Sequence, residues 1–185
     1  MMPGRRSFLR AVASAAPAIA LRDLLAAAAP EPPATSLHVI GAGEDRFGHP
    51  HSLGFSSLAF KVVPDETRGG LFMIEHRNLL PGGPPLHMHP NQEEWFYVMD
   101  GAVVFQVGDQ RVRLRPGESI LAPRAVPHTF SAVHDPSHLL IAFCPAGKMQ
   151  QYFLDAEKHP DQAAKAEFMD RYDMQWIGPS PFWKS

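Results

Sequence analysis

The stretch Pro84–Gly101, PPLHMHPNQEEWFYVMDG, decides how the rest of the chain is interpreted. It places His87 and His89 two residues apart and puts Glu94 on the segment that follows. Side chains at positions i and i+2 of a β-strand point to the same face, so the two imidazoles face a common centre, with a carboxylate in reach from the next strand. The stretch therefore predicts the beginning of a metal site.

A further candidate metal ligand, His128, lies in the segment APRAVPHTF at 122–130. Three imidazoles and one carboxylate form a mixed nitrogen and oxygen donor set that suits Fe(II), Mn(II), Ni(II), Cu(II) or Zn(II). Cys144 is the single cysteine, which excludes an intrachain disulfide and a cysteine-based zinc site. We therefore expect a divalent transition metal, held by His87, His89, Glu94 and His128.

The composition favours an all-β fold. At 185 residues the chain has the length of one domain, and its 19 Pro and 14 Gly suit many short strands joined by turns. The pattern predicts an antiparallel sandwich or barrel followed by two C-terminal helices, Met149–Lys158 and Asp161–Tyr172. Besides the strands of the opening stretch, the predicted strands are Leu37–Ile40, Ser57–Val63, Leu71–Leu80, Ala102–Val107, Arg111–Leu114, Ser119–Leu121, His128–Val133 and Leu139–Phe143.

The N-terminal segment is expected to be a targeting signal and not part of the fold. Arg5-Arg6-Ser7-Phe8-Leu9-Arg10, followed by an alanine-rich apolar run, resembles a twin-arginine export signal. We assign residues 1–29 to this signal and residues 30–36 to a proline-rich linker. The resemblance implies a periplasmic or secreted bacterial protein.

Charge and hydropathy argue against two classes of partner. The formal net charge of -2 is distributed without a basic stripe, so we expect no nucleic-acid partner. The chain also lacks an uninterrupted run of about 20 apolar residues, so we expect no integral membrane span.

The other histidines are less informative. His49-Pro50-His51 copies the two-apart spacing, but its proline and flanking glycines predict a loop and not a metal site. His76 shares a strand face with Phe72 and Ile74, which leaves open a contact to a substrate, a proton carrier, or a buried hydrogen-bonded histidine. Four more are expected to be solvated: His38, His134, His138 and His159.

The two histidine-bearing segments resemble the motifs of the cupin family of small β-barrels. In the first motif, His87, His89, Glu94 and Gly101 match, and Glu94 fits better than Glu93 because it leaves six residues before Gly101. In the second motif, Gly117, Pro123 and His128 match, whereas Ala125 and Ala132 replace the usual glycine and asparagine. These replacements concern turn geometry and leave the candidate ligands intact.

The resemblance implies a cupin-type antiparallel β-barrel or jelly roll at 37–147, with a C-terminal helical extension at 148–185. It also implies a homodimer, because cupins commonly pair through their sheets. The C-terminal segment Met169–Pro181 resembles the tail of quercetin-dioxygenase-like small cupins.

Three functions remain open at this point. The first is a metal-dependent dioxygenase that acts on a small aromatic or enolic substrate, with Glu94 as metal ligand and possible catalytic base. The second is a non-redox metal enzyme such as an isomerase or decarboxylase, and the third is a small-molecule-binding module without turnover. A cluster of apolar side chains suggests a dry pocket: Phe72, Ile74, Phe96 and Phe130.

Overall fold

The computed structural model describes residues 38–53, 56–134 and 136–183. The predicted export signal at 1–29 and linker at 30–36 lie outside these residues. The described helices include none that is long and apolar enough to cross a membrane.

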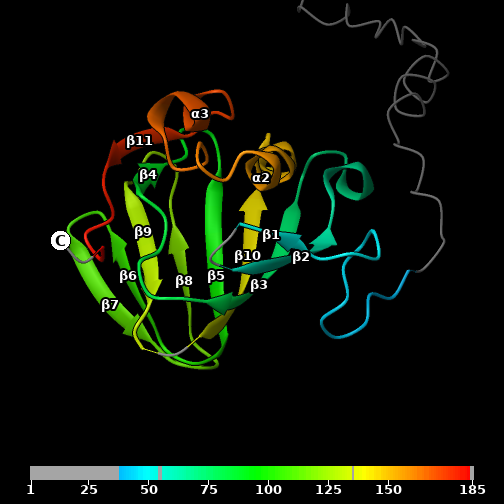
Figure 1. Cartoon of the computed structure of the whole chain (residues 1–185), viewed down its shortest axis with the longest axis horizontal. Helices are drawn as coiled ribbons and strands as arrows, with labels where there is room; N and C mark the ends of the chain where they lie inside the picture. The colour runs from blue at the N-terminus through cyan, green and yellow to red at the C-terminus, as the bar shows by residue number, and fades with distance from the viewer. Residues whose placement is uncertain (1–37, 54–55, 135, 184–185) are drawn as a thin grey trace, which may run out of the picture. The chain divides into compact units, whose positions relative to one another are not determined.

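Two antiparallel sheets form the body of the fold (Figure 1). The first sheet has the strand order β1-β2-β3-β10-β5-β8, and the second has the order β11-β4-β9-β6-β7. The first contains β1 (His51–Ser52), β2 (Ser57–Val62), β3 (Phe72–Leu79), β10 (Ser137–Cys144), β5 (Glu93–Asp100) and β8 (Ser119–Ala122). The second contains β11 (Gln175–Gly178), β4 (Leu86–Met88), β9 (His128–Ala132), β6 (Val103–Val107) and β7 (Gln110–Leu114). The all-β prediction is confirmed, with two sheets in place of one closed barrel.

Alternation along the strands explains how the sheets bury their inner faces. In β5, Glu94, Phe96 and Val98 are buried while their neighbours are more exposed. Phe105 of β6 lies opposite Phe130 of β9, and both rings pack against Phe96 from the other sheet, at centroid distances of 5.0 and 5.1 Å. The aromatic core therefore joins the two sheets directly beside Glu94.

A tight turn leads the chain into β4. Gly83 has a positive φ of 64°, and a Cβ at this position would overlap the carbonyl oxygen of Phe130. Only glycine permits both this backbone conformation and this close approach. The turn thereby sets β4 against β9, where His87 and His128 are register partners.

Helices α2 (Met149–Lys158) and α3 (Ala166–Asp170) lie at one end of the sheets, with α3 beside β11 and β4 and α2 near β10 and β1 in Figure 1. The predicted first C-terminal helix has the observed bounds of α2, but the predicted helix at Asp161–Tyr172 was too long. Turns occupy 160–164, and the backbone at Lys165 is extended, so the second helix begins only at Ala166. The segment at 148–185, expected to be helical, also contains β11, which pairs with β4.

The prediction of a first strand at Leu37–Ile40 was wrong for the described residues His38–Ile40, which form no strand. Val39 is 87% exposed, so this segment buries no apolar face. The first strand is instead β1, in which His51 pairs with Leu58 of β2. His51 therefore starts a strand and is buried, whereas the sequence predicted a loop.

Candidate metal centre

Three strands bring the four predicted metal ligands together. His87 lies in β4, His89 directly follows that strand, Glu94 lies in β5 and His128 begins β9. All four side chains are buried, and each offers a nitrogen or oxygen atom within 4.8 Å of those of the other three. The fold therefore gathers residues that are distant in sequence into one donor set that could hold a metal ion.

Hydrogen bonds fix the orientation of all three imidazoles. His87 Nδ1 lies 2.9 Å from the carbonyl oxygen of Pro85, and His128 Nδ1 lies 2.9 Å from that of Val126. His89 Nδ1 lies 2.9 Å from the side-chain oxygen of Gln92. Carbonyl oxygens only accept hydrogen bonds, so each Nδ1 carries a proton, and each Nε2 presents a lone pair once it is deprotonated.

Two of the Nε2 atoms, those of His89 and His128, converge on a carboxylate. His128 Nε2 lies 2.8 Å from Glu94 Oε2, and His89 Nε2 lies 3.2 Å from the same oxygen. Each of these Nε2 atoms either carries a proton and donates to the carboxylate, or is deprotonated and can bind a cation in place of that proton. A divalent metal ion therefore fits this arrangement, with Nε2 of the histidines and the Glu94 carboxylate as its donors.

Electrostatics keep Glu94 ionised. Burial by itself would raise the pKa of the Glu94 carboxyl, but the hydrogen bonds and charges of His128 and His89 outweigh burial and hold this pKa below its ordinary value. Burial lowers the pKa of His87 to about 3, and the neighbouring His128 and His89 act in the same direction. At neutral pH, the carboxylate and the neutral His87 are thus in the protonation states that metal binding requires.

Glu93 points to a different partner. Its carboxylate pairs with the Arg124 guanidinium, at distances of 2.6 and 2.8 Å between oxygen and nitrogen atoms. Glu94 is therefore the carboxylate that lies with the histidines, as the motif spacing predicted. The His49-Pro50-His51 segment lies apart from this cluster, and His51 pairs with Glu157 of α2 at 2.8 Å.

Sequence reasoning missed Gln92 as a supporting residue. Its side chain is buried, accepts the hydrogen bond from His89 and donates one to the carbonyl oxygen of Pro145 at 2.8 Å. No sequence pattern points to this glutamine, because its role depends on the distant loop after β10, whose Pro145 carbonyl oxygen accepts a hydrogen bond from the Gln92 amide.

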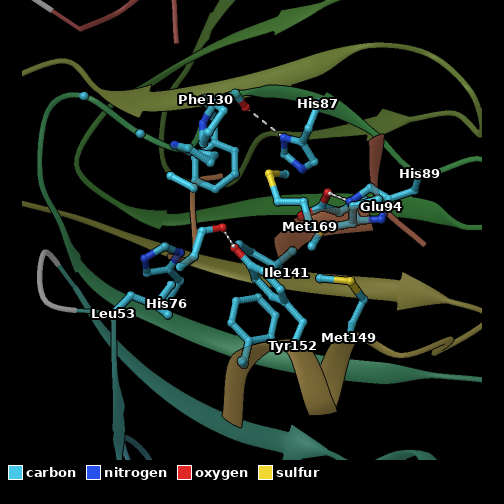
Figure 2. A pocket seen from close by; sticks show the side chains of 18 of the residues that line it. Leu53, His76, His87, His89, Glu94, Phe130, Ile141, Met149, Tyr152 and Met169 are labelled. Carbon is cyan, nitrogen blue, oxygen red and sulfur yellow. Dashed lines mark hydrogen bonds and ion pairs between the residues drawn. The ribbon is translucent and has the colours of Figure 1, made fainter. Parts of the chain in front are cut away.

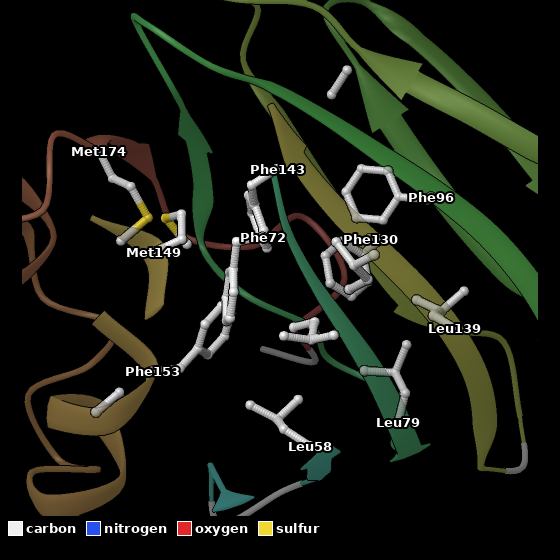
Figure 3. Packing of buried hydrophobic residues seen from close by; sticks show 14 of the residues in the cluster. Leu58, Phe72, Leu79, Phe96, Phe130, Leu139, Phe143, Met149, Phe153 and Met174 are labelled. Atoms are coloured by element: carbon white, nitrogen blue, oxygen red, sulfur yellow. The ribbon is translucent and has the colours of Figure 1, made fainter. Parts of the chain in front are cut away.

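A pocket of about 430 Å³ opens beside the cluster (Figure 2). His87, His89 and Glu94 form part of its lining, and most of the remaining lining is apolar. Three of the apolar residues, Phe143, Met149 and Phe153, also belong to the core shown in Figure 3, so the wall is backed by packed side chains. Of the described residues that line the pocket, none is a lysine or an arginine.

The predicted apolar set divides between the pocket and the core. Phe130 lines the pocket, whereas Phe72, Ile74 and Phe96 lie in the hydrophobic core. Helix α2 supplies wall residues that the sequence did not indicate, because its apolar face was expected to cover a sheet edge. His138, which was expected to be solvated, pairs with Glu75 at 2.7 Å.

Comparison with known proteins identifies the central segment. Residues 76–143 match the family model described as the cupin domain. The oxidoreductase OpS7 of Beauveria bassiana (strain ARSEF 2860) is 26% identical over 103 residues, a match that covers 56% of this chain and 24% of OpS7. The chain thus spans about a quarter of the length of that relative.

Two solved structures are similar to parts of this chain. An RmlC-like cupin from Shewanella frigidimarina NCIMB 400 aligns with a TM-score of 0.53 at 17% identity, over 62% of this chain and 96% of that protein. KdgF from Halomonas sp. aligns with a TM-score of 0.44 at 20% identity, over 50% of this chain and 82% of KdgF. At such identities the likeness to the Shewanella protein concerns the fold. Residues 76–143 therefore match a cupin domain, and the Shewanella protein shares the fold of this chain.

Proposed function

We propose that this protein is a metal-dependent oxidoreductase of the dioxygenase type that acts on a small aromatic or enolic molecule. One observation carries the proposal: the cluster of three histidines and Glu94 borders an apolar pocket whose described lining has no lysine or arginine. A site for a sugar acid or a phosphate would need such cations, whereas a flat, uncharged ring is favoured by apolar walls. The weak similarity to an oxidoreductase agrees with this class of reaction.

The proposed metal ligands are His87, His89, Glu94 and His128. A divalent Fe, Mn, Ni, Cu or Zn ion held there would act as a Lewis acid that acidifies and orients a bound hydroxyl group, and a redox-active ion would also serve the reaction with O₂. The side chains around it exclude water and hold an aromatic ring against Phe130 and Phe143. In a dioxygenase reaction both oxygen atoms of O₂ enter the organic product, so the overall reaction needs no separate reductant.

Glu94 carries the proposed catalytic role in addition to its role as a metal ligand. Its lowered pKa makes the free carboxylate a weak proton acceptor, so the environment favours metal binding over proton transfer. Its action as a base therefore depends on weakening its contacts to His89 and His128 when substrate binds.

The test combines metal analysis with oxygen uptake. The purified protein is analysed for bound metals and then incubated with a panel of flavonols and smaller enols in an oxygen electrode. Bound iron, manganese, nickel or copper with substrate-dependent O₂ uptake is the expected result. Zinc without uptake would refute the dioxygenase proposal and leave a non-redox metal enzyme or a non-catalytic binding protein as the alternatives.

A matched pair of variants tests the metal ligands. We expect His128→Ala to lose most of the bound metal, because only three of the four proposed donors remain. His134→Ala serves as the control because His134 is exposed and lies outside the cluster. Equal metal content in the two variants would contradict the proposed donor set.

We also propose that residues 1–29 direct twin-arginine export, so that the mature protein is periplasmic or secreted, and that it forms a homodimer without binding nucleic acid. The Arg5-Arg6 motif supports the export proposal. Mass spectrometry of the exported protein would reveal removal of the signal, and sedimentation analysis would give the subunit number. An exported protein that keeps its first 29 residues would contradict the signal assignment.

A further inference from the structure

The polar groups that line the pocket outside the metal cluster differ in whether they have partners. The Tyr152 hydroxyl donates a hydrogen bond to the carbonyl oxygen of Ala163 at 3.2 Å, and Trp183 Nε1 donates one to that of Gly83 at 3.0 Å. Both groups thus donate their hydrogen to a backbone carbonyl oxygen of the protein. They help to close the pocket wall and are less available to a bound molecule.

His76 is the exception. It lines the pocket and is 3% exposed, and its Nε2 has no hydrogen-bond partner among the described residues. Its register partners on the neighbouring strands are Leu58 and Leu139, and its ring meets Phe130 edge to face at a centroid distance of 6.1 Å. These neighbours offer no polar side chain, so an imidazole here costs folding free energy.

Figure 2 shows His76 beside Leu53, away from His89 and Glu94 in that view. The pocket therefore has the metal cluster at one place and an isolated polar group at another, with apolar walls between them. A molecule that binds the cluster through one end could meet the imidazole with a different part of its structure. A buried polar atom that lacks a partner in the fold is well suited to accept or donate a hydrogen bond to such a molecule.

We infer that His76 is a specificity-determining residue, whose Nε2 hydrogen-bonds an uncharged hydroxyl or carbonyl group of the substrate while another part of the substrate binds at the metal cluster. This inference rests on the proposed function, and it narrows the substrate class to apolar molecules with two separated polar groups. Because the pocket lining has no described lysine or arginine, the second polar group carries no charge.

The protonation state of His76 agrees with this role. Burial lowers the pKa of His76 to about 4, although the charge of Glu94 acts in the opposite direction. The imidazole is therefore neutral at physiological pH, with one nitrogen donating and the other accepting. A neutral imidazole recognises hydroxyl and carbonyl groups without requiring an anion.

Two flavonols provide a matched pair of probes. 3-Hydroxyflavone carries a hydroxyl and carbonyl pair that can chelate a metal, and it has no other polar substituent. Quercetin adds hydroxyl groups on the remaining rings. Binding of each probe is measured by absorbance with Zn²⁺-loaded protein in the absence of O₂, so that turnover does not interfere, for the wild type and for His76→Phe, His76→Leu and His76→Gln.

We expect His76→Phe and His76→Leu to weaken quercetin binding about tenfold and to leave 3-hydroxyflavone within about twofold of the wild type. His76→Gln keeps a polar side chain and should restore part of the affinity for quercetin. Equal effects of His76→Phe on the two probes, or no effect on either, would overturn the inference. If both probes bind here but the purified protein shows no O₂ uptake with them in the oxygen electrode, that result counts against the dioxygenase proposal alone.

A second measurement decides the inference even if neither probe binds. Thermal unfolding of metal-free His76→Phe protein at pH 7.5 should occur at the wild-type temperature or above it, because the variant replaces an unpaired polar ring by an apolar one among apolar neighbours. A drop of several degrees would show that His76 stabilises the fold, and the substrate-binding role would be rejected. Failure of both flavonols to bind the wild type would instead reject the proposed substrate class.

Discussion

Replacing Gln92 by methionine should weaken metal binding even though Gln92 is not a metal ligand. In the wild type, the Gln92 oxygen accepts the hydrogen of His89 Nδ1, which leaves the His89 Nε2 lone pair free. Methionine has a similar length but no strong acceptor. The ring proton of His89 can then move to Nε2, where it donates to Glu94 Oε2, which lies 3.2 Å away. A metal ion can then bind His89 Nε2 only after this proton has returned to Nδ1.

The size of the effect follows from the loss of this one orienting contact. Removing a residue that orients a metal-bound histidine typically costs about 10- to 100-fold in affinity, or about 1.4 to 2.7 kcal/mol of binding free energy. Loss of the bond from Gln92 to Pro145 adds a cost in stability of about 1 kcal/mol. The variant should therefore remain folded and still bind metal, but more weakly.

The assay is a competition titration of Zn²⁺ between the protein and a chromophoric chelator, with circular dichroism as a check of the fold. Gln110→Met is the matched control, because Gln110 is exposed on β7 and lies outside the cluster. The reasoning is refuted if folded Gln92→Met protein binds Zn²⁺ as tightly as the control. The gap between the variants should persist at higher pH, because the proton only moves between the two nitrogens of the neutral His89 ring and none is released.

Three further predictions concern individual residues. Glu94→Gln should remove most of the bound metal, whereas Glu93→Gln should lose only its ion pair with Arg124 and keep its metal. Metal analysis of both proteins distinguishes these outcomes. Ala125 has a φ of 56°, so Ala125→Gly should raise the free energy of unfolding by about 0.5 to 1 kcal/mol in urea titrations, while the control Ala102→Gly should lower it. Because the pKa of His76 is about 4 in the folded protein and 6.5 for an unperturbed histidine, the unfolded chain takes up a proton first as the pH falls. Through this group the free energy of unfolding of the wild type should fall by about 3 kcal/mol between pH 6.5 and pH 4. The free energy of unfolding of His76→Phe should fall correspondingly less. An identical pH dependence in both proteins would contradict a buried, neutral His76.

The sequence predicted the strands of the core because their side chains alternate. Phe96 and Val98 share a face with Glu94 in both the pattern and the structure, and this alternation is a local property of β5. The same rule failed at His38–Ile40, where a short apolar run has no sheet to join, and Val39 stays exposed. Strand propensity predicts a strand only where a neighbouring strand can accept its hydrogen bonds.

The sequence predicted the donor residues of the candidate metal site but not the residues that orient them. His87, His89, Glu94 and His128 occur in recognisable spacings, whereas the acceptor that orients His89 belongs to Gln92, held in place by the loop at Pro145. The role of His76 likewise depends on what faces it across the pocket. Such contacts join residues far apart in sequence, and no local pattern encodes them.

The pairing of β11 with β4 has a consequence for the order in which the site is assembled. The last of the four cluster residues, His128, leaves the ribosome before β11, which pairs with the strand that carries His87, and before Trp183, which borders the pocket. In the nascent chain, the donor set is thus synthesised before one side of its pocket exists. We therefore expect metal to reach the donors more readily before the C-terminal segment packs beside them than afterwards.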